Sequence, residues 1–121
     1  MTEPSSLPES SGKTQDVVCA KVWLQPGSEE RVRAWALHIQ GHRAEALRSL
    51  EDEGVVIESV FFDPNAGQPC LIYYMRSASE AQAVAVAKRS VRAIDSYHQR
   101  FKRDTWTRVE RLELLVDLYR E

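Results

Sequence analysis

Short runs of apolar residues, separated by polar and turn-forming positions, predict four strands along the chain. The first, Val17 to Leu24, is rich in β-branched residues and carries apolar side chains on both of its alternating faces. Val55 to Asp63 and Cys70 to Arg76 repeat this pattern, and the residues of a tight turn at Pro64 to Gly67 separate them. The two segments therefore predict an antiparallel hairpin. Leu112 to Tyr119 is predicted as the last strand.

Apolar positions at helical spacing predict a first helix between the first two strands. It opens after Ser28, a residue type that caps helices, and ends at Gly54. Ser79 and Gln82 have the spacing of a capping box and predict a second helix that runs toward Ser90. One or two further helical turns are expected beyond it, where four side chains share one face: Ile94, Tyr97, His98 and Phe101.

The predicted order of elements is strand, helix, strand, strand, helix, strand. Right-handed crossovers convert this order into an α+β, ferredoxin-like βαββαβ fold, in which a four-stranded antiparallel sheet carries its helices on one face. Residues 1–15 lack the apolar side chains needed to build a core, so we expect a disordered N-terminal tail. One domain is expected at residues 16–121.

The predicted strands are apolar on both faces, although the helices can cover only one of them. In the second strand, Ile57 and Phe61 point to one face while Val60 and Phe62 point to the other. An apolar face of this size, left bare on a monomer, favours association. We therefore expect a homodimer in which two sheets pack face to face, forming a dimeric α/β barrel.

Composition limits the classes of partner and the cellular location that we expect, but it does not indicate a reaction. The 121 residues include 43% hydrophobic and 28% charged residues, which are globular proportions, and a net charge of -2 gives no general attraction to nucleic acid or to an anionic membrane. No apolar run reaches the roughly 20 residues of a membrane span, and no secretory signal opens the sequence, so a cytoplasmic protein is expected. Cys19 and Cys70 lack C-x-x-C spacing and are expected as reduced thiols.

Four segments carry a likeness to known proteins: EGVVIESVFFD at Glu53 to Asp63, LIYYMRS at Leu71 to Ser77, IDSYHQRFKRDTW at Ile94 to Trp106, and LELLVDL around Glu113. Together they resemble an uncharacterised bacterial family, a domain of unknown function within the dimeric α/β-barrel, ferredoxin-like group. That wider group includes cofactor-independent monooxygenases of antibiotic biosynthesis, haem-degrading enzymes, lactone isomerases and stress-responsive proteins. The resemblance implies the fold and the dimer, and it leaves the activity open.

Arg43 occupies an apolar position of the predicted first helix. On a helical wheel it falls near the centre of the apolar stripe, where an unpaired charge would be very costly. Glu58, in the middle of an apolar strand, is the expected partner. Two interpretations stay open. Arg43 and Glu58 form a buried pair that fixes the packing, or they are ligand-binding residues, with Arg43 holding an anionic or carbonyl group.

His98 shares an apolar helix face, and Asp95 lies one turn earlier, where its carboxylate could hold the imidazole. If His98 faces a cavity, it is the candidate catalytic acid-base residue. Tyr73, Tyr97 and Trp106 are then the candidate ligand-binding residues that form the apolar wall of that cavity. The alternative is that His98 is a satisfied core histidine.

No motif in the sequence predicts a cofactor or a metal. His38, His42 and Glu45 follow one side of the first helix, but such polar residues on a surface helix are usually only solvated. Two functions remain open. The first is a cofactor-free, monooxygenase-like or isomerase-like protein that binds or transforms a small apolar or anionic molecule. The second is a non-catalytic ligand-binding or stress-responsive dimeric module, and the sequence does not decide whether the chain is an enzyme.

Overall fold

Four antiparallel strands form one sheet in the order β2-β3-β1-β4. The computed structural model describes residues 15–64 and 67–120, so the predicted tail before Gln15 and the centre of the predicted turn lie outside the described residues. The strands are β1 (Asp16–Leu24), β2 (Val55–Asp63), β3 (Cys70–Ser77) and β4 (Trp106–Arg111). The predicted hairpin is confirmed, because β2 and β3 pair antiparallel. β2 and β4 form the two edges of the sheet.

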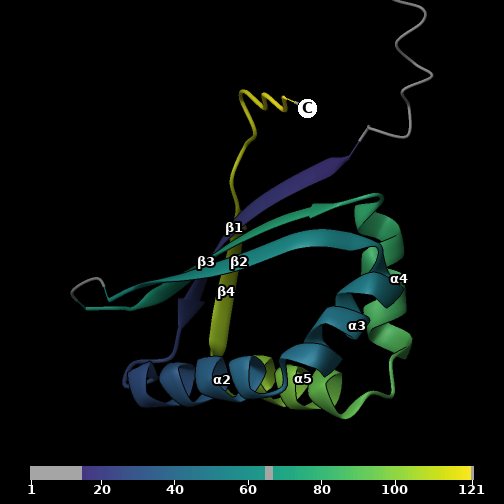
Figure 1. Cartoon of the computed structure of the whole chain (residues 1–121). Helices are drawn as coiled ribbons and strands as arrows, with labels where there is room; N and C mark the ends of the chain where they lie inside the picture. The colour runs from purple at the N-terminus through teal and green to yellow at the C-terminus, as the bar shows by residue number, and fades with distance from the viewer. Residues whose placement is uncertain (1–14, 65–66, 121) are drawn as a thin grey trace, which may run out of the picture.

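The helices of the described residues lie on one face of this sheet (Figure 1). They are α2 (Glu29–Gly41), α3 (Arg43–Glu53), α4 (Glu80–Arg89) and α5 (Ala93–Thr105). The first two connect β1 to β2, and the last two connect β3 to β4. The predicted α+β class and four-stranded antiparallel sheet are therefore confirmed. Among the described residues, none of the helices is both long and apolar enough to cross a membrane.

The core lies between the sheet and α2 and α5. Alternate residues of a strand face opposite sides, so Val22 and Leu24 of β1 point together toward the helices and are buried. Phe101 of α5 is fully buried, and its ring stacks on that of Trp35 in α2 with a centroid distance of 4.7 Å. This stack fixes α2 against α5 on the covered face.

The first helical region contains a break that the sequence pattern did not predict. α2 ends at Gly41 and α3 begins at Arg43, with His42 between them in a non-helical conformation. Glycine is a weak helix former, and the backbone N–H of His42 bonds back to the carbonyls of the last turn of α2, which closes that helix. The break changes the direction of the chain, so residues 32–50 form two helices rather than the predicted single one.

The two predicted helix caps differ in outcome. Ser79 accepts a hydrogen bond from the backbone N–H of Gln82 at 3.1 Å, which confirms the first half of the capping box. Ser28 precedes α2 as predicted, but its hydroxyl donates to the carbonyl of Gln25 at 2.6 Å and caps no helical N–H. Ser28 therefore stabilises the turn before α2 rather than the helix itself.

The C-terminal part of the chain also differs from its prediction. α5 is a full helix of 13 residues, and the last strand is β4 at Trp106–Arg111 rather than Leu112–Tyr119. β4 is an edge strand whose side chains are mostly exposed, so its sequence lacks the apolar alternation that reveals buried strands. The apolar residues that follow it lie outside regular secondary structure.

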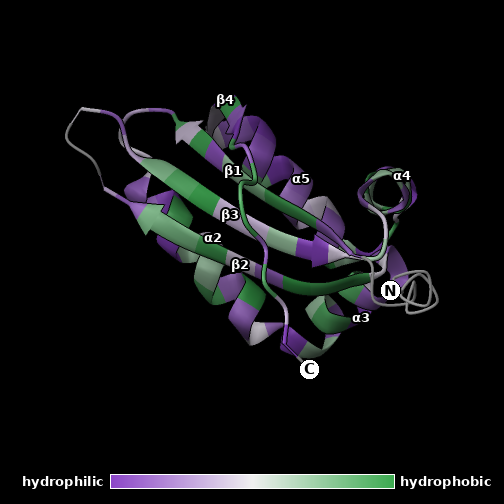
Figure 2. Cartoon of the chain, turned by 90° about the horizontal axis from the view of Figure 1, so that it is seen from above, coloured by the Kyte–Doolittle hydropathy of each residue, from purple (hydrophilic) through white to green (hydrophobic). Residues whose placement is uncertain are grey.

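The face of the sheet opposite the helices, called the bare face, is covered by no helix of the described residues, and only the C-terminal segment passes over it (Figure 2). Ile57 and Phe61 of β2 are exposed there. The ring of Trp23 lies between two cations, with Lys21 Nζ 4.6 Å and the guanidinium of Arg108 4.8 Å from its centroid. The bare face is therefore apolar along β2 and carries charges of both signs toward β4, where a guanidinium nitrogen of Arg108 lies 4.0 Å from a carboxylate oxygen of Glu110. Both cysteines of the chain are free thiols.

Candidate functional site

A cavity of about 400 Å³ lies between the covered face of the sheet and the helices. This volume falls in the range of sites that hold small organic molecules. Side chains from α2, α3, α4, α5, β2, β3 and β4 reach it. Its apolar wall includes Trp35, Ile39, Leu50, Val60, Met75 and Ile94.

Three aromatic rings meet in one part of the wall. The centroids of Tyr73 and Trp106 lie 5.4 Å apart in an edge-to-face arrangement, and each lies 6.4 Å from that of His98. The structure thus brings together three of the residues that the sequence predicted for the site. Tyr97 is not among the cavity-lining residues, because its ring stacks on His38 at 3.7 Å, between α5 and α2.

Two polar atoms in this aromatic cluster have no hydrogen-bond partner among the described residues. They are the hydroxyl of Tyr73 and the indole N–H of Trp106, and both are buried. A buried polar group without a partner costs about 1–3 kcal/mol. Burial also raises the pKa of Tyr73 well above its usual value, so the phenol remains a hydrogen-bond donor at neutral pH.

His98 is held by Trp35 rather than by Asp95. The indole N–H of Trp35 donates to Nδ1 of His98 at 3.1 Å, so a neutral His98 carries its proton on Nε2. Burial, reinforced by the charge of Lys102, lowers the pKa of His98 to about 4. The imidazole is therefore neutral at physiological pH, with its basic nitrogen occupied, and in this arrangement it is a hydrogen-bond donor rather than a general base.

Asp95, which was the predicted partner of His98, is engaged elsewhere. One carboxylate oxygen accepts a hydrogen bond from Ser49 at 2.6 Å, and the other accepts one from Ser90. These bonds join α5 to α3 and to the end of α4. The prediction that Asp95 holds the imidazole was wrong, because two nearer hydroxyl groups satisfy its carboxylate.

Glu53, at the end of α3, is the most chemically useful group in the cavity wall. Burial raises its pKa to about 7, with a further contribution from the negative charges of Glu58 and Asp95. A carboxyl group with that pKa is about half ionised at neutral pH, so it can both accept and release a proton. The sequence pattern alone did not distinguish Glu53 from other surface glutamates.

Glu58 and Lys102 form the charged part of the cavity next to Glu53. Burial raises the pKa of Glu58, although the charge of Lys102 opposes this effect. Burial lowers the pKa of Lys102, and the two glutamates act against that shift. The ammonium of Lys102 lies 4.7 Å from the ring centroid of Trp106, which places a cation beside the aromatic cluster.

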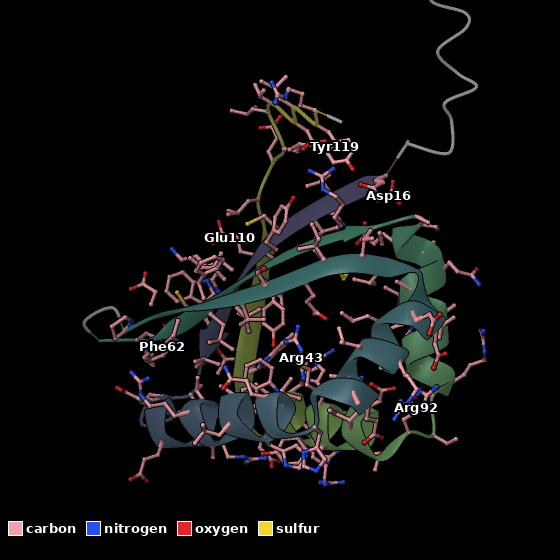
Figure 3. All side chains as sticks on the ribbon, viewed as in Figure 1. Asp16, Arg43, Phe62, Arg92, Glu110 and Tyr119 are labelled. Atoms are coloured by element: carbon pink, nitrogen blue, oxygen red, sulfur yellow. The ribbon has the colours of Figure 1, made fainter. Side chains whose placement is uncertain are left out.

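Arg43 lines the cavity but does not form the predicted pair with Glu58. Its side chain lies in the angle between the sheet and the helices (Figure 3), and the residue is exposed rather than buried. Among the ion pairs of the described residues, none joins Arg43 to Glu58. The expectation of a buried pair was wrong, since Arg43 is exposed and no ion pair of the described residues joins it to Glu58.

No group of three or more potential metal ligands occurs within residues 15–64 and 67–120. His42 Nδ1 lies 2.8 Å from the carbonyl oxygen of His38, and the two imidazole rings stack at 4.2 Å. These histidines interact with each other, and His38 also stacks on Tyr97. The residues of the described site offer carboxylates, an ammonium and aromatic N–H and O–H donors.

Signals for the missed residues were present in the sequence. Lys102 follows His98 by four positions, so on a helix both side chains project from the same face. Glu53 directly precedes Gly54, the predicted C-terminal stop of a helix, so its side chain lies near the next strand. A raised pKa needs the burial and the neighbouring carboxylates that only the folded chain supplies.

These features define a small α+β domain with a single antiparallel sheet, helices on one face, and a partly charged cavity between them. Residues 15–121 match the model of a family of unknown function, DUF6176, and the chain belongs to that family. Searches of curated proteins and of solved structures each gave no match.

Proposed function

We propose that the protein binds a small, largely apolar molecule with a polar head group in the cavity and moves a proton on that molecule without a resident cofactor. The observation that carries this proposal is Glu53, whose carboxyl group has a pKa of about 7 in the wall of a mainly apolar cavity of about 400 Å³. A general acid-base group works best when its pKa lies near the operating pH. The proposed class of reaction is isomerase-like or cofactor-free monooxygenase-like.

The neighbours of Glu53 support a division of roles. Glu53 would take a proton from a carbon next to a carbonyl group, and the electron pair of that C–H bond would move to the carbonyl oxygen to form an enolate. Lys102 would stabilise the negative oxygen, and Arg43 would hold an anionic group at the open side of the cavity. Return of the proton from Glu53 to a different carbon gives an isomer, whereas the oxygenase-like reaction also requires dioxygen.

Binding is tested with a panel of aromatic ketones, quinones and polyketide-like compounds, using the thermal shift of the full chain as the signal. Ala87→Trp fills the cavity from α4 and should abolish the shift, because Ala87 lines the cavity. Ala81→Trp is the matched control on the same helix, since Ala81 is exposed and does not line the cavity. Failure of every compound to stabilise the wild-type chain would contradict the proposal.

Proton transfer is tested on each binding compound in D₂O, with NMR detection of hydrogen–deuterium exchange at its acidic C–H. Glu53→Gln should slow the exchange at least 100-fold while the compound still binds, because glutamine cannot accept the proton. Glu51→Gln, at an exposed position of the same helix, should leave it unchanged. Binding with exchange that is insensitive to Glu53 would instead favour the non-catalytic ligand-binding module.

We also propose a ferredoxin-like homodimer that buries the bare sheet face. The strand order β2-β3-β1-β4 and the connections through the helices support this architecture. Ile57 and Phe61, exposed on the bare face, support the dimer. Light scattering at micromolar concentration should give about 28 kDa, which is twice the chain mass of 13.8 kDa.

A further inference from the structure

His98 keeps one free hydrogen-bond donor in the wall of the cavity. Its Nδ1 accepts the indole N–H of Trp35, and an indole nitrogen can only donate, so the neutral ring carries its proton on Nε2. Within the described residues, Nε2 itself has no hydrogen-bond partner. It also differs from the hydroxyl of Tyr73 and the indole N–H of Trp106, because those two atoms are closed off from solvent and Nε2 is not. Since His98 lines the cavity, its Nε2–H is a donor that an entering molecule can reach.

Trp35 fixes both the tautomer and the orientation of this imidazole. The indole is buried in the core, where it stacks on Phe101 with an angle of 8° between the two ring planes. Because this packing holds the indole, its N–H stays directed at Nδ1 of His98, and the two ring centroids lie 5.7 Å apart. A hydrogen bond to one ring nitrogen of a histidine sets the role of the other nitrogen. The Nε2 proton is therefore positioned by the fold before any ligand binds.

A second donor lies beside His98 in the same part of the cavity. Lys102 follows one helical turn later on α5 and also lines the cavity. Its ammonium is 4.7 Å from the ring centroid of Trp106, and that centroid lies 6.4 Å from the centroid of His98. Burial and then the charge of Lys102 lower the pKa of His98, so the ammonium and the imidazole are close. The two side chains thus offer N–H groups to a ligand atom that accepts hydrogen bonds.

The carboxylates of the cavity do not use the proton of His98. Glu53 accepts a hydrogen bond from Ser49 at 3.4 Å, and Glu53 and Glu58 both act on Lys102 through their charges. Neither carboxylate forms a hydrogen bond with His98 among the residues that the structure describes. The Nε2–H therefore satisfies no group of the protein and is available for a ligand. A ligand carbonyl supplies the missing acceptor, whereas the N–H of an amine does not.

We propose that the Nε2–H of His98 binds the carbonyl oxygen of the molecule that enters the cavity, with Trp35 as the residue that positions it. This inference rests on the proposed function and names the substrate class as ketones and esters rather than alcohols or amines. When Glu53 takes the proton from the neighbouring carbon, the electron pair of the C–H bond moves to the carbonyl oxygen. The hydrogen bonds from His98 and Lys102 strengthen as that oxygen becomes negative, and both donors keep their protons.

The binding test uses pairs of compounds. Each ketone that binds is compared with the analogue in which CH₂ replaces the carbonyl group, for example 2-tetralone with tetralin, and dissociation constants are measured by calorimetry. His98→Phe should weaken binding of the ketone by roughly 10-fold or more and leave binding of the CH₂ analogue within about twofold, because only the ketone loses a hydrogen bond. His98→Gln should retain much of the affinity for the ketone, since its amide supplies an N–H. His42→Phe is the matched control, because His42 is exposed and does not line the cavity.

The role of Trp35 is tested by long-range ¹H–¹⁵N NMR of the imidazole, which distinguishes the protonated ring nitrogen from the bare one. The wild-type chain at pH 7 should show the proton of His98 on Nε2, and addition of a ketone should shift the resonance of that proton. Trp35→Phe keeps an aromatic ring in the core but removes the N–H, so His98 should become a mixture of tautomers and the ketone should bind more weakly. Since the tautomer is measured on the wild type, the test holds even where a variant does not fold.

The outcomes separate this inference from the proposed function. Equal weakening of the ketone and its CH₂ analogue in His98→Phe, or a wild-type His98 with its proton on Nδ1, would overturn the role of His98 and leave proton transfer to Glu53 intact. Failure of every ketone to bind the wild-type chain would overturn the proposed function and this inference with it.

Discussion

The indole N–H of Trp35 donates to Nδ1 of His98 across 3.1 Å and so joins α2 to α5 at the edge of the cavity. This bond decides the role of the histidine. With Nδ1 occupied and the pKa lowered to about 4, His98 stays neutral and presents only its Nε2 proton. Proton acceptance in the cavity therefore falls to Glu53, at the end of α3.

The lowered pKa of His98 predicts a loss of stability in acid. The unfolded chain takes up a proton on this side chain near pH 6.5, whereas the folded chain resists protonation until about pH 4. The stability from the neutral imidazole is therefore present above pH 6.5 and is lost as the pH falls to 4, by roughly 3 kcal/mol. Urea unfolding at pH 7 and pH 4 should show a larger loss for the wild type than for His98→Gln, which has no such titration. An equal loss in both proteins would contradict the buried neutral state.

The raised pKa of Glu53 predicts the opposite trend. The folded chain retains the proton up to about pH 7, while the unfolded chain releases it near pH 4.5. Ionisation thus disfavours the folded state as the pH rises from about 4.5 through 7. Glu53→Gln should gain stability relative to the wild type between pH 5 and pH 8 in urea unfolding. Glu51→Gln should show no such change, and a carboxyl carbon titration of Glu53 by NMR should have its midpoint near 7.

Removal of the ring of Phe101 should destabilise the chain more than any surface change. Phe101 is fully buried and stacks on Trp35, so Phe101→Ala removes both apolar burial and this stack. The expected loss is about 3–5 kcal/mol in the free energy of unfolding. Leu37→Ala, at a position that is 70% exposed, should cost under about 0.5 kcal/mol. Chemical denaturation followed by tryptophan fluorescence measures both, and similar losses would show that the core is assigned wrongly.

Two glycines at helix ends should respond in opposite ways to alanine. Gly54 has a φ of +74°, a left-handed conformation that an added Cβ disfavours, so Gly54→Ala should lower stability by about 1–2 kcal/mol. Gly41 ends α2 without a positive φ, and an added Cβ there meets no atom within 4 Å. Gly41→Ala should therefore be neutral or stabilising by up to about 1 kcal/mol. Thermal unfolding of the two variants gives the comparison.

The strands β1, β2 and β3 could be predicted from their composition. They are runs of β-branched and aromatic residues, and the turn-forming residues Gly54 and Pro64 set the limits of the hairpin. β4 was misplaced because an exposed edge strand needs no apolar alternation. The segment 112–119 had the stronger strand pattern, yet among the described residues only its first residue, Leu112, forms a backbone hydrogen bond with a strand, through the carbonyl of Cys19. An apolar pattern along the sequence indicates that a segment favours burial, but it does not identify the surface against which the segment packs.

The candidate site could be predicted in part, because some of its residues are anomalous in the sequence. His98 and Glu58 stood out as polar residues in apolar surroundings, and both reach the cavity. Arg43 also reaches it, on the side that the helical wheel indicated, but it is exposed rather than buried. Tyr97 could not be separated from Tyr73 by pattern, since an aromatic residue on an amphipathic helix contacts whichever neighbour the packing angle supplies.

The sequence by itself determined the α+β class, the antiparallel hairpin and the presence of polar groups at apolar positions, because these depend on contacts between near neighbours along the chain. Only the tertiary structure decided that Trp35 holds His98, that two serines hold Asp95, and that Glu53 has its pKa near 7. Each of these relations joins residues from different elements. Burial and charge at a point in space depend on all the segments that meet there, and no single segment encodes them.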